Sequence, residues 1–130
     1  MKIEHTAFNV AEPAAVASWF RDHLGMKIVR RMDTPPFMHF LADDSGNTLL
    51  EIYNNPPDEV PAYAEMNPLL FHLAFVSPDP VADRDRLVAA GAGFVDEVHT
   101  PAGDHLIMLR DPWGHCIQLC RRATPMLRET

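Results

Sequence analysis

The sequence predicts an α+β fold built from two β-α-β-β-β modules in tandem. Three observations support this prediction. The segment HTAF at residues 5–8 recurs as HLAF at residues 72–75, an offset of 67 residues. Pro13 and Pro80 keep the same offset. Each half of the chain also passes from a strand pattern to a helix and then to three short apolar runs. A fixed offset of this kind indicates a duplicated structural unit, here of about 60 residues.

The first module begins with an alternating pattern over Lys2–Asn9, in which His5 and Ala7 share one face of a predicted strand. A helix is expected from Pro13, because proline is favoured in the first helical turn. Gly25 suits the position that ends this helix. Three more strands are predicted from the short apolar runs that follow, over Met26–Arg31, Phe37–Ala42 and Thr48–Tyr53.

The second module repeats this order. A strand is predicted over Leu69–Ser77, and Asp79 is expected to cap a helix that starts at Pro80 and ends at Gly91. The remaining strands are predicted over Gly93–Val98, Leu106–Arg110 and Cys116–Arg121.

Residues 1–121 are expected to form a single domain. Module one covers residues 1–54 and module two covers residues 69–121, with a linker at residues 55–68 between them. Four prolines between Asn54 and Pro68 disfavour both helix and strand in that segment. Residues 122–130 are expected to form a short polar tail.

The charge balance argues against two classes of partner. Eighteen acidic residues against eleven basic ones give a formal net charge of −7. Nucleic acid and anionic membranes both require clustered lysine and arginine, so neither is an expected partner. The chain also shows no signal-peptide pattern and no apolar run long enough to span a membrane.

The two cysteines predict a reducing compartment. Cys116 and Cys120 are four residues apart in one predicted strand, which separates them by about 13 Å. A disulfide needs Cα atoms within about 7 Å of each other, so both are expected to be free thiols. The cytoplasm is the simplest location for such a protein.

Four polar residues occupy predicted strand faces that are otherwise apolar. They are His5, Glu51, His72 and Gln118. His5 and His72 are 67 residues apart, and so are Glu51 and Gln118, which places them at corresponding positions of the two modules. A carboxylate buried in such a face is costly unless it is paired or binds a metal. A lone strand histidine is usually a hydrogen-bonded structural residue, but this symmetry favours a site for a divalent first-row metal.

The segment DPWGHCIQL at residues 111–119 is similar to a family signature, D-P-x-G-x-x-[hydrophobic]-E-[hydrophobic]. With these four residues, the chain resembles the vicinal oxygen chelate superfamily, also called the glyoxalase/bleomycin resistance/dioxygenase family, over about residues 1–121. The resemblance implies a glyoxalase-like fold, in which two βαβββ modules form a cup-shaped mixed sheet. It also implies that metal ligands lie on the concave face, at His5, Glu51, His72 and Gln118.

The resemblance further implies a metal-dependent lyase or isomerase of glyoxalase type. Such an enzyme stabilises an enediolate-like intermediate on a divalent ion, which here would be Zn, Ni, Co, Mn or Fe. Glu51 would be the catalytic proton shuttle. Gln118 departs from the family pattern, because glutamate is common at this position. An amide oxygen can ligate a metal, but it cannot accept a proton at neutral pH.

Two alternatives remain open at this stage. Two histidines and one carboxylate are also the ligands of non-heme Fe(II) extradiol-type dioxygenases, although in that group the carboxylate comes from the final strand, where this chain has Gln118. The third candidate is a metal-free protein that binds a small molecule or drug, as bleomycin-resistance proteins do. The expected partners are a small-molecule substrate and a second copy of the chain in a homodimer.

Other histidines are assigned weaker roles. His39 and His105 fall at the third and seventh predicted strands, where they would either line the cup or be exposed. His99 and His115 are expected in loops.

Overall fold

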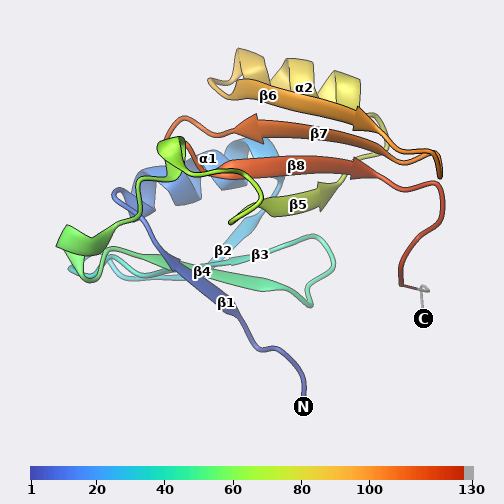
Figure 1. Ribbon diagram of the computed structural model, residues 1–130. Helices are drawn as coiled ribbons and strands as arrows, with labels where there is room; N and C mark the ends of the chain where they lie inside the picture. The colour runs from blue at the N-terminus through green and yellow to red at the C-terminus, as the bar shows by residue number, and fades with distance from the viewer. Residues whose placement is uncertain (128–130) are drawn as a thin grey trace. The chain divides into compact units, whose positions relative to one another are not determined.

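The computed structural model describes residues 1–127 and divides into two compact units, Met1–Pro61 and Ala62–Thr130. Each unit has the order β-α-β-β-β (Figure 1), which confirms the predicted α+β fold. The first unit contains β1 (Thr6–Asn9), α1 (Pro13–Leu24), β2 (Lys27–Arg31), β3 (His39–Ala42), β4 (Leu49–Tyr53) and the 3-10 turn η1 (Pro57–Glu59). The second contains the 3-10 turn η2 (Tyr63–Glu65), β5 (Leu73–Val76), α2 (Pro80–Ala89), β6 (Gly93–His99), β7 (His105–Arg110) and β8 (Cys116–Arg121). The end of the predicted tail, residues 128–130, lies outside the described residues.

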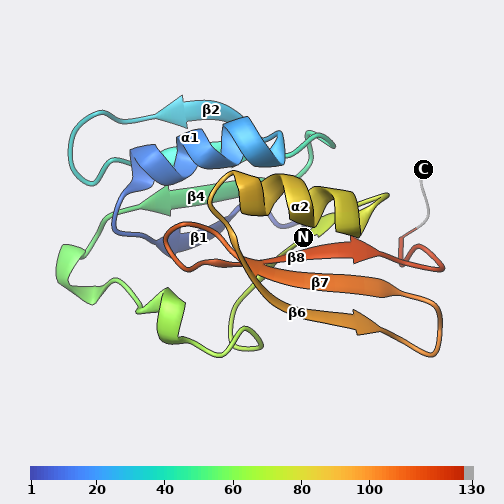
Figure 2. The same cartoon turned by 90° about the horizontal axis from the view of Figure 1, so that it is seen from above.

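Each unit forms one four-stranded mixed sheet. The strand orders are β1-β4-β3-β2 and β5-β8-β7-β6. In both sheets the first strand runs parallel to the last one of its unit, and the other neighbours are antiparallel. The helix of each unit covers one face of its sheet, as Figure 2 shows for α1 over β2 to β4.

The strand register repeats with the offset found in the sequence. Ala7 pairs with Glu51 in the first sheet, and Ala74 pairs with Gln118 in the second. Both edge hairpins also carry a register shift, between Ile28 and Arg30 in β2 and between Phe94 and Asp96 in β6. The duplication therefore extends from sequence to hydrogen-bonded register.

The core of each unit lies between its helix and the covered face of its sheet. In the first unit, Leu41, Ile52 and Phe20 are fully buried, since α1 presents its apolar side to the strands. In the second unit, the corresponding buried residues are Ile107, Leu109, Ile117 and Leu87. Because side chains alternate along a strand, the residues between these positions point to the opposite, uncovered face.

Both predicted ends of α1 and the predicted start of α2 are confirmed, whereas α2 ends at Ala89, two residues before the predicted Gly91. Gly25 ends α1 with a left-handed backbone at φ 70°, and the Met26 amide donates to the Phe20 carbonyl. Asp79 caps α2, because its carboxylate accepts a hydrogen bond from the Ala82 amide at 3.1 Å.

The first strand of each unit is shorter than the sequence pattern predicts. β1 begins at Thr6 and β5 begins at Leu73, so His5 and His72 each lie one residue before a strand. In the first unit, the pairing starts at Thr6 and Leu50, and residues 2–4 lie beside the turn that precedes β4 instead of beside a strand. Alternation alone could not detect this missing partner.

The segment between the modules contains the two 3-10 turns and one buried side chain, that of Tyr63. No helix among residues 1–127 is both long enough and apolar enough to cross a membrane.

Candidate metal and ligand site

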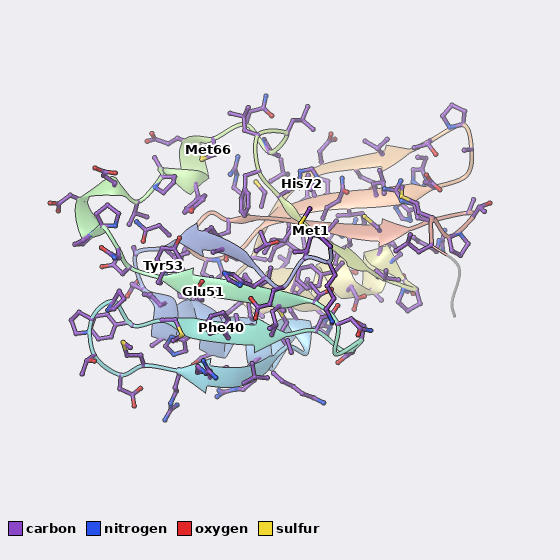
Figure 3. All side chains as sticks on the ribbon, turned by 90° about the horizontal axis from the view of Figure 1, so that it is seen from below. Met1, Phe40, Glu51, Tyr53, Met66 and His72 are labelled. Atoms are coloured by element: carbon purple, nitrogen blue, oxygen red, sulfur yellow. The ribbon has the colours of Figure 1, made fainter. Side chains whose placement is uncertain are left out.

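On the uncovered face of each sheet, one polar side chain lies between two apolar neighbours. Phe40, Glu51 and Ala7 lie side by side across β3, β4 and β1. Figure 3 looks onto this face and shows Phe40 and Glu51 on neighbouring strands, with α1 behind them. The second sheet repeats this row with Met108, Gln118 and Ala74.

The structure brings His5 and Glu51 together. The distance between His5 Nε2 and Glu51 Oε2 is 3.2 Å. His5 precedes the partner of Glu51, Ala7, by two residues, so its side chain lies on the same face of the sheet. The edge of the Phe40 ring packs against the imidazole at a centroid distance of 5.6 Å. These contacts leave the Glu51 side chain 21% exposed.

A second carboxylate orients His5 from the other side. His5 Nδ1 donates a hydrogen bond to Glu4, whose side chain is exposed. This hydrogen bond raises the pKa of the His5 imidazole, and the charges of Glu4 and Glu51 act in the same direction. The Glu4–His5 pair also directs Nε2 toward Glu51, as carboxylate–histidine pairs do at metal sites.

The His5–Glu51 geometry fits a metal ion. Two ligand atoms that bind one ion at ordinary bond lengths lie about 3.0–3.4 Å apart. The observed separation of 3.2 Å falls in this interval. An ion would require both the Nε2 nitrogen and the carboxylate without a proton, since metal ligands must be deprotonated.

His72 presents a free ligand nitrogen in the second unit. Its Nδ1 lies 2.9 Å from the carbonyl oxygen of Pro68. A carbonyl can only accept, so Nδ1 carries the proton and Nε2 of neutral His72 has the lone pair. This is the tautomer that a metal-binding histidine needs.

Gln118 has a different partner from His72. It lies on the uncovered face, and its Oε1 accepts a hydrogen bond from the Cys120 thiol at 3.2 Å. An amide oxygen has two lone pairs, so one remains for a further donor or a metal. Cys116 and Cys120 are free and buried, as predicted, and burial raises the pKa of both thiols.

A pocket of about 440 Å³ lies beside Gln118 on the uncovered face of the second sheet. Its walls come from β6, β7, β8 and residues 67–69, and most of its lining side chains are apolar. Asn67, Asp96 and Gln118 are the polar groups of this lining. Pockets with this composition suit small organic ligands.

The DPWGH segment has a structural role. Asp111 Oδ1 accepts hydrogen bonds from the amides of Trp113 and His115, each at 2.9 Å. Its Oδ2 accepts from Nδ1 of His115 at 2.6 Å, and both side chains are buried. The motif therefore builds the turn before β8, which positions Gln118 four residues after Gly114.

Two expectations about histidines were wrong. His39 and His105 are buried, and both lie on the faces that the helices cover. His115 is also buried, in the turn just described.

Sequence reasoning also missed a group of three side chains. Among residues 1–127, Glu97, His99 and His105 are close enough together to bind a metal ion. The available signal is the Glu-x-His pair followed by a hairpin and another histidine, but the sequence pattern places His99 in a loop, whereas the structure places it in β6.

Comparison with protein-family models gives one match, the Glyoxalase/Bleomycin resistance protein/Dioxygenase superfamily, over residues 2–119. The chain belongs to this superfamily. Among curated proteins, it is 26% identical over 127 residues to the uncharacterized protein YwbC of Bacillus subtilis (strain 168), and the match covers 93% of this chain and 98% of YwbC.

Solved structures of this superfamily share the fold. A glyoxalase family protein from Bacillus cereus matches with a TM-score of 0.79 and 17% identity, over 95% of each chain. TnmS3, an antibiotic binding protein from Streptomyces sp. CB03234, matches with a TM-score of 0.70 and 20% identity, over 95% of this chain and 99% of that one. The superfamily includes both enzymes and binding proteins, so the choice between them depends on the site.

Proposed function

We propose that this protein is a metal-dependent lyase or isomerase of glyoxalase type, with His5, Glu51, His72 and Gln118 as ligands of a divalent ion. The observation that supports this most directly is the His5–Glu51 pair, whose 3.2 Å separation suits two ligands of one ion. The tautomer of His72 is consistent with the same role. Zn, Ni, Co, Mn and Fe all accept such a ligand set.

The chemistry follows from the types of residue present. A bound divalent ion supplies Lewis-acid stabilisation of a substrate oxyanion. Glu51 is the catalytic residue in this proposal, because its partly exposed carboxylate can take up and return a proton at the neighbouring carbon. Gln118 cannot share that task, since an amide is not a base at neutral pH. Proton transfer would therefore depend on Glu51 alone.

The runner-up is a small-molecule-binding protein without metal chemistry. The apolar lining of the pocket beside Gln118 favours it, and TnmS3 is an antibiotic binding protein with this fold. An extradiol-type dioxygenase ranks third, because the amide Gln118 occupies the strand from which that group takes its carboxylate.

The expected partners are a small-molecule substrate and a second copy of the chain. Ile3, Leu70 and Val76 are large apolar side chains with exposed fractions of 75% or more, and apolar surface of this kind favours association. Light scattering coupled to size exclusion would give the mass of a dimer if this proposal is correct and of a monomer if it is wrong.

The metal ligands are tested by substitution at Glu51. We expect Glu51→Gln to weaken binding of the divalent ion by at least about 100-fold, because it removes the only charged ligand. Glu4→Gln, which removes only the orienting carboxylate, should weaken it by about tenfold. Calorimetric titration of the full chain with Zn²⁺, Ni²⁺ or Co²⁺ measures both effects.

Glu59→Gln is the matched control, since it makes the same charge change at an exposed turn. A folded Glu51→Gln variant with unchanged affinity for the metal ion would remove Glu51 from the site.

Turnover of an α-ketoaldehyde–thiol adduct by the metal-loaded protein would support the lyase. Catechol cleavage with iron, or ligand binding without any metal, would support the alternatives instead.

A further inference from the structure

We propose that Glu97, His99 and His105 form a second divalent-metal site, at the end of the β6–β7 hairpin. Each residue offers one ligand atom, and these atoms lie within 4.8 Å of one another. Two imidazoles and one carboxylate suit Zn²⁺ and its first-row neighbours. This inference is independent of the function proposed above.

The strand register places the three side chains on one face. His99 pairs directly with His105, and Glu97 pairs with Ile107. Residues two apart in a strand share a face, so Glu97 and His99 point to the same side as His105 and Ile107. Ile107 is fully buried, on the face of the sheet against which α2 packs.

This face is not the one that carries Gln118. Gln118 pairs with Met108, which alternates with Ile107 in β7, so Gln118 points to the uncovered side of the sheet. Arg84 of α2 confirms the side on which Glu97 lies, because its Nη1 is 3.8 Å from Glu97 Oε2. The proposed site and the Gln118 ligand position are therefore separated by the thickness of the sheet.

One carboxylate oxygen already faces both imidazoles. Glu97 Oε1 lies 2.6 Å from His105 Nε2 and 3.6 Å from His99 Nε2. Ligand atoms around a tetrahedral zinc ion are about 3.3 Å apart, a value between these two distances. A zinc ion at this point would take the place of the present hydrogen bond between Glu97 and His105.

The exposed fraction of the side chain increases from one ligand to the next. The His105 side chain is 6% exposed, that of Glu97 is 30% exposed and that of His99 is 69% exposed. His105 is thus fixed by the core, whereas His99 can turn to adjust its angle to an ion. The two rings stack at a centroid distance of 4.2 Å, which keeps both near Glu97. The exposed side also gives an ion access from water.

The same hairpin forms a wall of the pocket on the opposite face. Asp96, Val98, Leu106 and Met108 line that pocket, and they alternate with the three ligands along β6 and β7. An ion that joins both strands at the hairpin end would hold this wall in place.

The test is calorimetric titration of the full chain with Zn²⁺ in four forms: wild type, Glu51→Gln, His99→Gln and the double variant. We replace His99 and not the buried His105 because the His99 side chain is exposed, so its replacement leaves the fold intact. We expect His99→Gln to bind one zinc ion fewer per chain than wild type, or to bind it more than about 100-fold more weakly. This loss should appear equally in the Glu51→Gln background.

Co²⁺ absorption is a second readout, because ligand removal alters the visible bands of a bound cobalt ion. His23→Gln is the control, since it removes another partly exposed histidine and should change nothing. Unchanged zinc stoichiometry and affinity in His99→Gln would overturn the proposal. Loss of binding in Glu51→Gln with no effect of His99→Gln would support only the site proposed above, and the reverse pattern would support only this one.

Hydrogen exchange tests whether bound zinc stabilises the β6–β7 hairpin. In the Glu51→Gln background, zinc should increase the protection of amides in residues 99–105, and this increase should be absent when His99 is also replaced. Equal exchange with and without zinc in the Glu51→Gln variant would contradict the proposal that a bound ion stabilises the end of the β6–β7 hairpin.

Discussion

At the scale of single residues, position 114, in the turn before β8, requires a glycine. Its backbone φ is 92°, which L side chains rarely adopt, and a Cβ placed there would lie 2.6 Å from backbone atoms of Ala64. The glycine of the DPWG segment is therefore required by both conformation and space. Asp111 completes the turn by accepting the two amide hydrogen bonds that follow it.

We expect Gly114→Ala to lower the free energy of unfolding by about 2–5 kcal/mol, because left-handed strain adds to overpacking against Ala64. Gly46→Ala is the matched control. Gly46 also has a positive φ, of 70°, but nothing lies within 4 Å of its Cβ position, so the loss there should be about 1–2 kcal/mol. Chemical denaturation measures both values, and equal losses would contradict the steric explanation.

At the scale of elements, Arg110 at the end of β7 holds residues 62–66, which include η2, through hydrogen bonds. Its guanidinium donates to the carbonyl oxygens of Tyr63 and Met66, each at 2.7 Å, and to that of Gly114 at 3.1 Å. The Tyr63 ring packs against the His115 ring at a centroid distance of 4.5 Å. Residues 62–66 therefore belong to the second unit, although the sequence places them in the predicted linker at residues 55–68.

We expect Arg110→Met to destabilise the protein by about 2–4 kcal/mol, because three carbonyls lose hydrogen bonds from a charged donor. Amides of residues 62–66 should also exchange faster. Arg31→Met, at an exposed site, should stay within about 0.5 kcal/mol of wild type. Unchanged exchange at residues 62–66 in Arg110→Met would show that other contacts hold this segment.

At the scale of the whole molecule, each unit encloses its own core and repeats the same register. β8 is a central strand of the second sheet, and its thiols at Cys116 and Cys120 are only 3% and 7% exposed. A reagent therefore reaches these thiols only when the structure opens.

We expect Cys116 and Cys120 to react slowly with a thiol-specific reagent in the native protein. Their rate should rise with denaturant in parallel with the loss of structure seen by circular dichroism. Ser45→Cys introduces a thiol at an exposed turn and should react immediately. Fast labelling of the native wild-type protein would contradict the buried position of β8.

Much of the fold could be predicted because its signals are local or repeated. The helix ends at Gly25 and Asp79 depend on neighbouring residues, and the offset of 67 residues predicted the second module from the first. The same offset identified Glu51 and Gln118 as equivalent positions. The pairing of His5 with Glu51 followed from their predicted shared face, and the metal-binding role of the four residues remains a proposal.

The orientation of the β6 residues could not be predicted, because it depends on a bulge. The register shift between Phe94 and Asp96 inserts one residue into β6, and an extra residue moves every later side chain to the other face. Glu97 and His99 thereby point toward the side covered by α2. His105 was misassigned for a related reason, since its face is determined by its pairing with His99 across the hairpin.

Sequence alone predicts the duplicated β-α-β-β-β modules, the family resemblance and the four polar positions, because periodicity, caps and repeats depend on neighbouring or equivalent residues. Only the tertiary structure decided which residues of different strands meet. It brought Glu97 and His99 to His105, bound Arg110 to the distant carbonyls of Tyr63 and Met66, and formed the pocket beside Gln118. These contacts depend on strand register, which hydrogen bonds between distant segments establish.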